Sequence, residues 1–172
     1  MSPTRKLNCV LTLLFACSFA PAVASGAQRA ARAAAASAPA ATVRAFYRFH
    51  LSHDTAFAER NVRLRRHWLE PRLYRLLLFE LHRPTPPDEP PYMEGDPFTN
   101  SQETPQTFRT GVTTIDDDGA QVETFFLWTE RSRVLSQRRY LVHLRRSRGR
   151  WLISNITDEG GEDLLKELQR MK

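Results

Sequence analysis

Two histidines lie three residues apart in the segment His50-Leu51-Ser52-His53-Asp54. On a helix this spacing places both imidazoles on one face, where they and Asp54 can hold a metal ion. His50 also falls on the apolar stripe of that helix, and Asp54 stands where an aspartate caps the next helix. These local roles favour a structural interpretation, so we predict no metal site here and no cofactor.

The run Asp116-Asp117-Asp118 is a second group of carboxylates, followed by Gly119. Three carboxylates can attract calcium, but the spacing of an EF-hand loop is absent. Asp-Gly is a typical hairpin turn, and this explains the run without a metal ion.

Asp96 is the third candidate, in the loop Gly95-Asp96-Pro97-Phe98. Its carboxylate can act as a general base beside a pocket. It can also bond the backbone amides of Phe98 and Thr99 as a turn former, which is the commoner use of aspartate before proline. As candidate ligand-binding residues we take His50, Asp96, Phe98, Gln102 and His143.

Arginines form two groups that can grip phosphates or carboxylates through forked hydrogen bonds. The alternative is a solvated helix face and a solvated turn. The first group is Arg60, Arg63, Arg65 and Arg66, and the second is Arg145, Arg146, Arg148 and Arg150.

The elements that position these residues read as helices first and strands afterwards, which is the pattern of an α+β domain. We expect N-terminal helices packed on a curved, cone-like antiparallel sheet of about four strands. We expect a first helix that is capped by Thr42 and a second that runs from about Asp54 to Trp68. A third helix opens at Pro71, and a last one covers Glu162–Met171. The expected strands are Phe108–Ile115, Ala120–Thr129, Arg138–Arg146 and Trp151–Thr157.

The N-terminus has the pattern of a secretory signal. Arg5 and Lys6 precede the uncharged, mostly apolar stretch Leu7–Ala24, which ends in Ala22-Val23-Ala24. We therefore predict cleavage between Ala24 and Ser25. A retained membrane anchor is the less favoured interpretation, because the apolar stretch is short and is interrupted by Asn8, Ser18 and Pro21. Leu14-Phe15-Ala16-Cys17 resembles a lipobox, so a lipoprotein anchored through Cys17 is the alternative.

These features divide the chain into a signal peptide (1–24), an alanine-rich linker (25–41) and one α+β domain (42–172). Both cysteines lie before Ala24, so the mature chain has no disulfide and no thiolate chemistry. The formal charge of +6 falls to +4 when Arg5 and Lys6 are removed. A basic surface can meet anionic partners, but for an exported chain we expect no nucleic acid, and membrane contact only if Cys17 is lipidated.

Three segments resemble a bacterial family of exported proteins, domain-of-unknown-function family 3828. They are Val43–Phe49, the loop Gly95–Phe98 with Gln102, and Trp151-Leu152-Ile153. Family members often pair that glutamine with aspartate, where Glu103 stands here. The resemblance covers roughly Thr42 to Asp158 and implies the cone-shaped fold of nuclear transport factor 2, with no established activity to carry over.

No nucleophile elbow or phosphate-cradling glycine loop is present in the sequence. We therefore expect an exported, periplasmic or secreted domain that binds a protein partner or a small apolar or anionic ligand without catalysis. The alternatives are an enzyme using Asp96 with His50 or His143, and an immunity-type factor that neutralises an effector. If the domain is an enzyme, we expect a polar pair in a pocket. If it binds a ligand, we expect a closed apolar cavity, and if it is an interaction domain, a filled core with an exposed patch.

Overall fold

The computed structural model describes residues 26–84, 93, 95–117 and 119–170. The predicted signal peptide, its cleavage site at Ala24 and Ser25, and Cys17 all lie outside these residues. Among the described residues, no helix is both long and apolar enough to cross a membrane.

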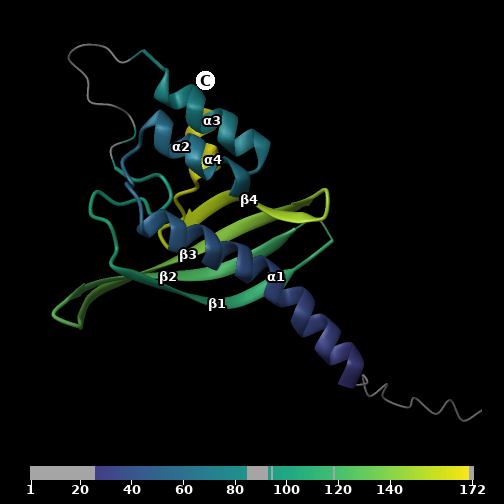
Figure 1. Cartoon of the computed structure of the whole chain (residues 1–172). Coiled ribbons are helices and arrows are strands. Elements are labelled where there is room, and N and C mark those ends of the chain that lie inside the picture. The colour runs from purple at the N-terminus through teal and green to yellow at the C-terminus, as the bar shows by residue number, and fades with distance from the viewer. Residues whose placement is uncertain (1–25, 85–92, 94, 118, 171–172) are drawn as a thin grey trace, which may run out of the picture.

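The chain forms helices and then an antiparallel meander, so the predicted α+β class is confirmed (Figure 1). The helices are α1 (Gly26–Leu51), α2 (Glu59–Arg65) with a 3₁₀ turn (Arg66–Trp68), α3 (Pro71–Leu81) and α4 (Leu164–Arg170). The strands are β1 (Thr107–Ile115), β2 (Ala120–Glu130), β3 (Arg133–Ser147) and β4 (Arg150–Asp158). They form one sheet in the order β1-β2-β3-β4, with every neighbouring pair antiparallel.

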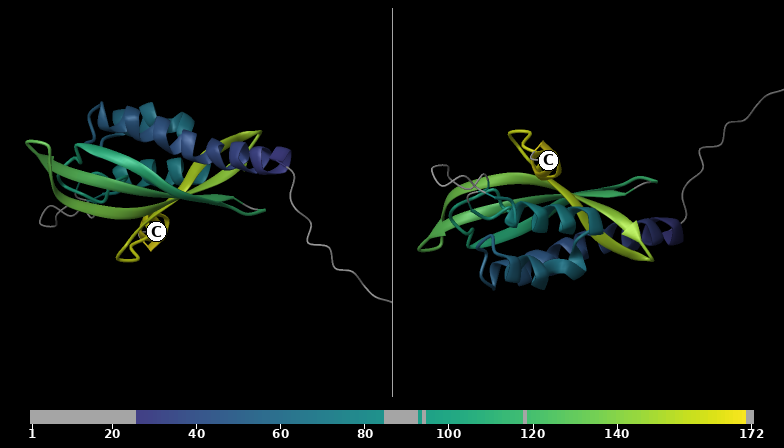
Figure 2. Two further views of the ribbon diagram at one scale, coloured as in Figure 1. Left: turned by 90° about the horizontal axis from the view of Figure 1, so that it is seen from below. Right: turned by 90° about the horizontal axis from the view of Figure 1, so that it is seen from above.

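Helix α1 crosses one face of the sheet, and the other helices gather near the β4 edge (Figure 1). Figure 2 shows α1 and the C-terminal α4 on opposite sides of the sheet. Helix α4 packs against α3 and β4. The sheet is therefore covered mainly by α1 on one face and flanked by helices at one edge.

The core lies between α1 and the inward face of β2 and β3. Strand β2 alternates as predicted, with Val122, Phe126 and Trp128 buried. From α1, the Tyr47 ring meets the Phe126 ring edge-on at 4.7 Å between centroids, and Phe126 meets Tyr140 at 5.0 Å. Such edge-to-face pairs add to the free energy of burial.

Helix α1 is longer than the sequence analysis predicts. It begins at Gly26, so Thr42 lies in its interior and does not cap it. Alanine has the highest helix propensity of any residue, which favours helix through the segment that we predicted as a linker. Ala40, at the end of that segment, already belongs to the core.

Helix α2 is shorter than predicted, and the prediction that Asp54 caps it is wrong. Its N-cap is Ala58, which offers no side-chain bond. The Asp54 carboxylate accepts a hydrogen bond from the amide of Ala56 instead and closes a turn ahead of the helix. This turn leaves the Asp54 carbonyl free to face Arg65.

Strand β3 begins at Arg133, five residues before the predicted start at Arg138. The β2–β3 hairpin closes through Arg131 and Ser132, which both have positive φ. Glycine, asparagine and aspartate are the usual residues in such a turn, so the sequence carries no signal for it.

The segment between α2 and α3 attaches to the free edge of β4. The Glu70 amide donates to the Ile153 carbonyl at 2.8 Å, and Leu69 pairs with Ile153 as a parallel bridge. The Glu70 carboxylate then caps α3, where Pro71 takes the first position, as predicted. This attachment sets α2 and α3 beside the β3–β4 hairpin.

The Phe126 ring should be a main determinant of stability. Phe126→Ala should lower the free energy of unfolding by about 3–5 kcal/mol, because it opens a cavity among buried rings. Phe125→Ala is the matched control, since Phe125 points to the other face and stacks on Arg109. Urea unfolding of both variants should show the larger loss for Phe126, and equal losses would contradict this packing.

Candidate functional site

The loop that begins at Gly95 is closed by a short hydrogen-bonded bridge. The Asp96 amide donates to the Ser101 carbonyl at 3.0 Å. Gly95 has φ +99°, and a Cβ atom there would lie 2.7 Å from the Ser101 carbonyl oxygen. Glycine is therefore required at the position that turns Asp96 inward.

The Asp96 carboxylate is buried and accepts three hydrogen bonds. Its Oδ1 accepts from the Phe98 amide at 2.9 Å. Its Oδ2 accepts from the Thr99 hydroxyl and from His50 Nε2, both at 2.7 Å. The prediction of a turn-forming aspartate is confirmed, although Thr99 contributes its hydroxyl and not its amide.

His50 links this carboxylate to a buried arginine. Arg65 Nε donates to His50 Nδ1 at 2.6 Å. An arginine can only donate, so Nδ1 must carry a lone pair and the ring proton must sit on Nε2. His50 is thus a neutral bridge between a guanidinium and a carboxylate, and the exposed fractions of His50, Arg65 and Asp96 are 0%, 1% and 5%.

The guanidinium of Arg65 is satisfied by backbone carbonyls as well. It donates to the carbonyls of Asn61 and Asp54, each at 2.8 Å, and to the His50 carbonyl at 3.3 Å. Burial lowers the pKa of Arg65 from its ordinary value, and the charges of Asp96 and Asp54 oppose that shift. We call Arg65, His50 and Asp96 the buried relay.

Two buried tyrosines hold the same loop from the sheet and from α1. The Tyr47 hydroxyl donates to the Phe98 carbonyl at 2.9 Å, and the Tyr140 hydroxyl donates to the Thr99 carbonyl at 2.6 Å. Burial, then the charge of Asp96, raises the pKa of Tyr47 well above its ordinary value. Both phenols therefore remain protonated donors that anchor the loop.

The buried relay has little chemistry left to offer a substrate. Both ring nitrogens of His50 are bonded, and both Asp96 oxygens accept hydrogen bonds from the protein itself. A general base needs a lone pair within reach of the substrate proton. The arrangement is that of a fully satisfied buried network, which fixes a conformation.

The alternative of metal binding at His50, His53 and Asp54 receives no support from the geometry. His53 is exposed and bonds the Phe49 carbonyl at 2.7 Å through Nδ1, while His50 points into the core. Within the described part of the chain, no three histidine, cysteine, aspartate or glutamate side chains are placed to hold a metal ion. The aspartate run also fits a turn, since Asp116 Oδ1 accepts from the Gly119 amide at 2.7 Å.

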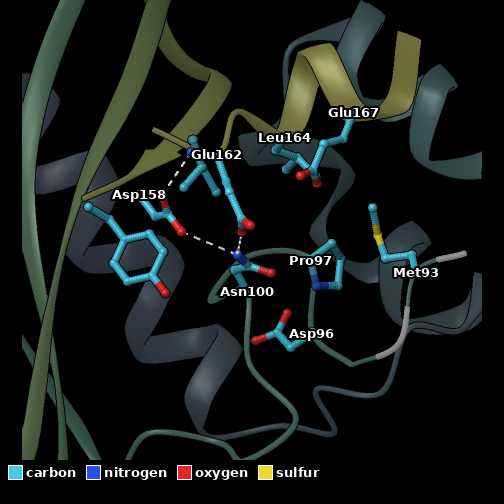
Figure 3. Close-up of a pocket in the computed structure, with 10 residues that line it drawn as sticks. Met93, Asp96, Pro97, Asn100, Asp158, Glu162, Leu164 and Glu167 are labelled. Atoms are coloured by element: carbon cyan, nitrogen blue, oxygen red, sulfur yellow. Dashed lines mark hydrogen bonds between the residues drawn. The ribbon is translucent and has the colours of Figure 1, made fainter. Parts of the chain in front are cut away.

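An acidic pocket of about 260 Å³ lies between the Asp96 loop and the start of α4 (Figure 3). Asn100 bonds the Asp158 carboxylate at 3.3 Å and also contacts the Glu162 carboxylate. Burial, then the charge of Glu162, raises the pKa of Glu167 at the same pocket. The pocket is open and polar, unlike the closed apolar cavity expected of an apolar-ligand binder.

The structure separates the remaining predicted residues. Phe98 is a core residue, with its ring 5.2 Å from those of Phe46 and His50. Gln102 lies in a surface hollow with Trp128 and Arg138. His143 lies in another hollow, where its Nε2 meets the Thr157 hydroxyl at 3.0 Å and burial lowers its pKa. Only His50, Asp96 and Phe98 therefore come together, and they form a structural unit.

A groove of about 840 Å³ brings together two arginines from each of the two predicted groups. Arg63 and Arg66 come from α2 and its 3₁₀ end, and Arg148 and Arg150 from the β3–β4 hairpin. Arg75 of α3 is the fifth arginine. The remaining lining residues are His67, Leu69, Pro71, Tyr74, Ser147 and Leu152. We call this site the arginine groove.

The arginine groove is positive without local compensation. None of its described lining residues is acidic, and in the described chain only Arg63 of its five arginines has an ion-pair partner, Glu59. Arg150 donates to the His67 carbonyl at 2.7 Å, and the Arg66 guanidinium lies 5.5 Å from the centre of the Tyr74 ring. Burial, then the charge of Arg150, lowers the pKa of His67, which keeps that ring neutral.

Sequence reasoning named four of the five groove arginines but did not predict that they share one site. It missed Arg75 of α3, which belongs to neither predicted group. It also counted Arg65 with the surface group, although Arg65 is buried in the relay. Helical spacing was the one signal that could have placed Arg75 at the surface, since Arg72 and Arg75 fall on the exposed face of α3.

Comparison with known proteins adds no relative: no family model, no curated protein and no solved structure matches this chain. The resemblance to family 3828 therefore stays a prediction.

Breaking the buried relay should destabilise the fold. Asp96→Asn should lower the free energy of unfolding by about 3–5 kcal/mol, because the Arg65 charge then lacks its counterion in the interior. The exposed Asp117→Asn is the control, with an expected change within about 0.5 kcal/mol. Chemical denaturation should separate the two variants, and an unchanged midpoint for Asp96→Asn would refute the structural role.

The acidic pocket should make stability depend on pH. The pKa of Glu167 is raised in the folded protein above its ordinary value of 4.5. Ionisation of Glu167 therefore lowers the free energy of unfolding as the pH rises above 4.5. Glu167→Gln should therefore be more stable than the parent at neutral pH, and this advantage should vanish below pH 4.5. Urea midpoints at several pH values test this, with Glu130→Gln as a control for net charge; a constant difference would contradict it.

Proposed function

We propose that the mature chain is a non-catalytic, exported binding domain that holds an anionic ligand or partner in the arginine groove. The observation that carries this proposal is the convergence of five arginines, from three elements, on one groove without a lining carboxylate. Guanidinium groups match the planar forks of phosphate and carboxylate, and several around one groove fit a ligand with more than one negative charge.

The saturated relay supports a binding role over an enzymatic one. The runner-up enzyme would use Asp96 with His50 or His143. The first pair is buried and fully bonded, and His143 lines a different hollow from Asp96. The filled aromatic core and the exposed arginine groove correspond to the features expected of an interaction domain.

Export remains part of the proposal on sequence grounds. The basic start, the apolar stretch Leu7–Ala24 and the small residues before Ser25 support release into the periplasm or the medium. Lipidation at Cys17 is the alternative route, and it would hold the same domain at a membrane.

Tripolyphosphate is a suitable first probe of the arginine groove. The variant Arg75→Gln/Arg148→Asn removes one arginine from each wall and should weaken binding at least tenfold in calorimetry, because two charge-assisted contacts are lost. The control Arg131→Asn/Arg133→Gln removes the same charge at the other hairpin, including the matching positive-φ arginine. It should bind within twofold of the parent.

Two results would overturn this proposal. The parent protein fails to bind tripolyphosphate and other multivalent anions, or both double variants lose affinity equally. The second result would mean that overall charge, and not the groove, attracts the anion.

A further inference from the structure

Two exposed apolar side chains lie beside the arginine groove. Leu64 of α2 is 45% exposed and Phe79 of α3 is 49% exposed. Leu64 shares a shallow hollow with Arg60 and Arg63, and Arg63 also lines the groove. The apolar surface of Leu64 is therefore continuous with the charged one.

Phe79 extends the same surface along α3. It follows Arg75 by four residues, so the two side chains are neighbours on the exposed face of the helix. Helices α2 and α3 run antiparallel, because Glu59 at the start of α2 meets His82 after α3 at 3.0 Å, while Arg66 lies over Tyr74. We call Leu64, Phe79 and the arginine groove together the α2–α3 face.

The charge of this face is almost uniformly positive. Besides the five groove arginines, Arg60 lines the hollow of Leu64, where Glu59 is the one carboxylate among the described lining residues. The nearby carboxylates are already engaged: Glu59 pairs with Arg63 and His82, and Glu70 caps α3. A partner that covers this face must supply negative charge at many points and also accept two apolar side chains.

We propose that the α2–α3 face docks the domain on an anionic phospholipid surface. This inference rests on the proposed function, because it assigns lipid phosphates as the anions that the arginine groove binds. The arginines bond phosphate oxygens while their apolar stems lie along the surface, and Leu64 and Phe79 enter the headgroup region. The contact needs no lipid on Cys17, so this inference departs from the sequence-based expectation that membrane contact requires lipidation of that residue.

A lipid surface fits the face better than a soluble polyanion does. A soluble polyanion would leave Leu64 and Phe79 in water, whereas a bilayer buries them. Headgroups are also mobile in the plane of the membrane, so each arginine can find a phosphate without a fixed pattern of partner charges. An acidic protein remains an outcome that the test distinguishes.

The experiment uses the Cys17→Ser variant of the protein, purified from an exporting host, so that no lipid can be attached at this position. Cosedimentation compares vesicles of phosphatidylcholine alone with vesicles containing roughly one-third phosphatidylglycerol. We expect binding to the anionic vesicles only, and weaker binding as salt rises, because surface charges are screened.

Paired variants locate the contact. Leu64→Gln/Phe79→Gln should lower partitioning onto anionic vesicles about tenfold, because less apolar surface is buried in the membrane, while tripolyphosphate affinity stays unchanged. The control is Val134→Gln/Leu135→Gln in the β2–β3 hairpin, where the two side chains are 51% and 60% exposed. It should partition within twofold of the parent.

The possible failures are distinct. Tripolyphosphate binding without preference for anionic vesicles overturns the membrane inference, leaves the proposed function standing and points to a soluble anion or an acidic protein. Loss of vesicle binding in both paired variants also overturns it, since the α2–α3 face would not be the site. If the parent protein binds neither tripolyphosphate nor anionic vesicles, both proposals are overturned.

Discussion

The buried relay of Arg65, His50 and Asp96 is the constraint on which the rest of the structure depends. A guanidinium and a carboxylate are expensive to remove from water, and they are tolerated here because an imidazole and several backbone groups satisfy them. The relay joins α1, α2 and the Asp96 loop. Arg65 and Asp96 follow His50 by 15 and 46 residues along the chain. Helix α2 has only seven residues and the Asp96 segment is an irregular loop, so the relay helps to fix both of them against the long helix α1.

The same relay explains the orientation of the arginine groove. Arg65 points into the core, whereas Arg63 on the same short helix and Arg66 at the start of the 3₁₀ turn lie on other sides and are exposed. The Leu69–Ile153 bridge then sets α3 against β4, and the β3–β4 hairpin brings Arg148 and Arg150 to the opposite wall. The burial of Arg65 thus helps to orient the arginines beside it.

Positive and negative surfaces are separated in this molecule. The acidic side chains Asp158, Glu162 and Glu167 gather at the pocket beside the Asp96 loop, whereas the arginine groove lies between α2, α3 and the β3–β4 hairpin. The field outside the groove is therefore not cancelled by neighbouring carboxylates, and it can attract an anionic surface before contact.

The sequence by itself determined the features that depend on neighbouring residues: the helices-then-strands order, the first proline of α3, the alternation of β2 and the turn-forming aspartate at Asp96. Each follows from local spacing and local hydrogen bonding. The sequence did not predict the start of α1, because the helix propensity of the alanines outweighed the capping preference of Thr42. It did not predict the β2–β3 turn either, because that turn uses Arg131 and Ser132 and not the usual turn residues. Only the tertiary structure decided that Arg65 is buried and that two arginine groups meet: Arg150 contacts the His67 carbonyl across 83 residues of sequence. Such contacts depend on how distant segments pack, which local patterns of residues do not encode.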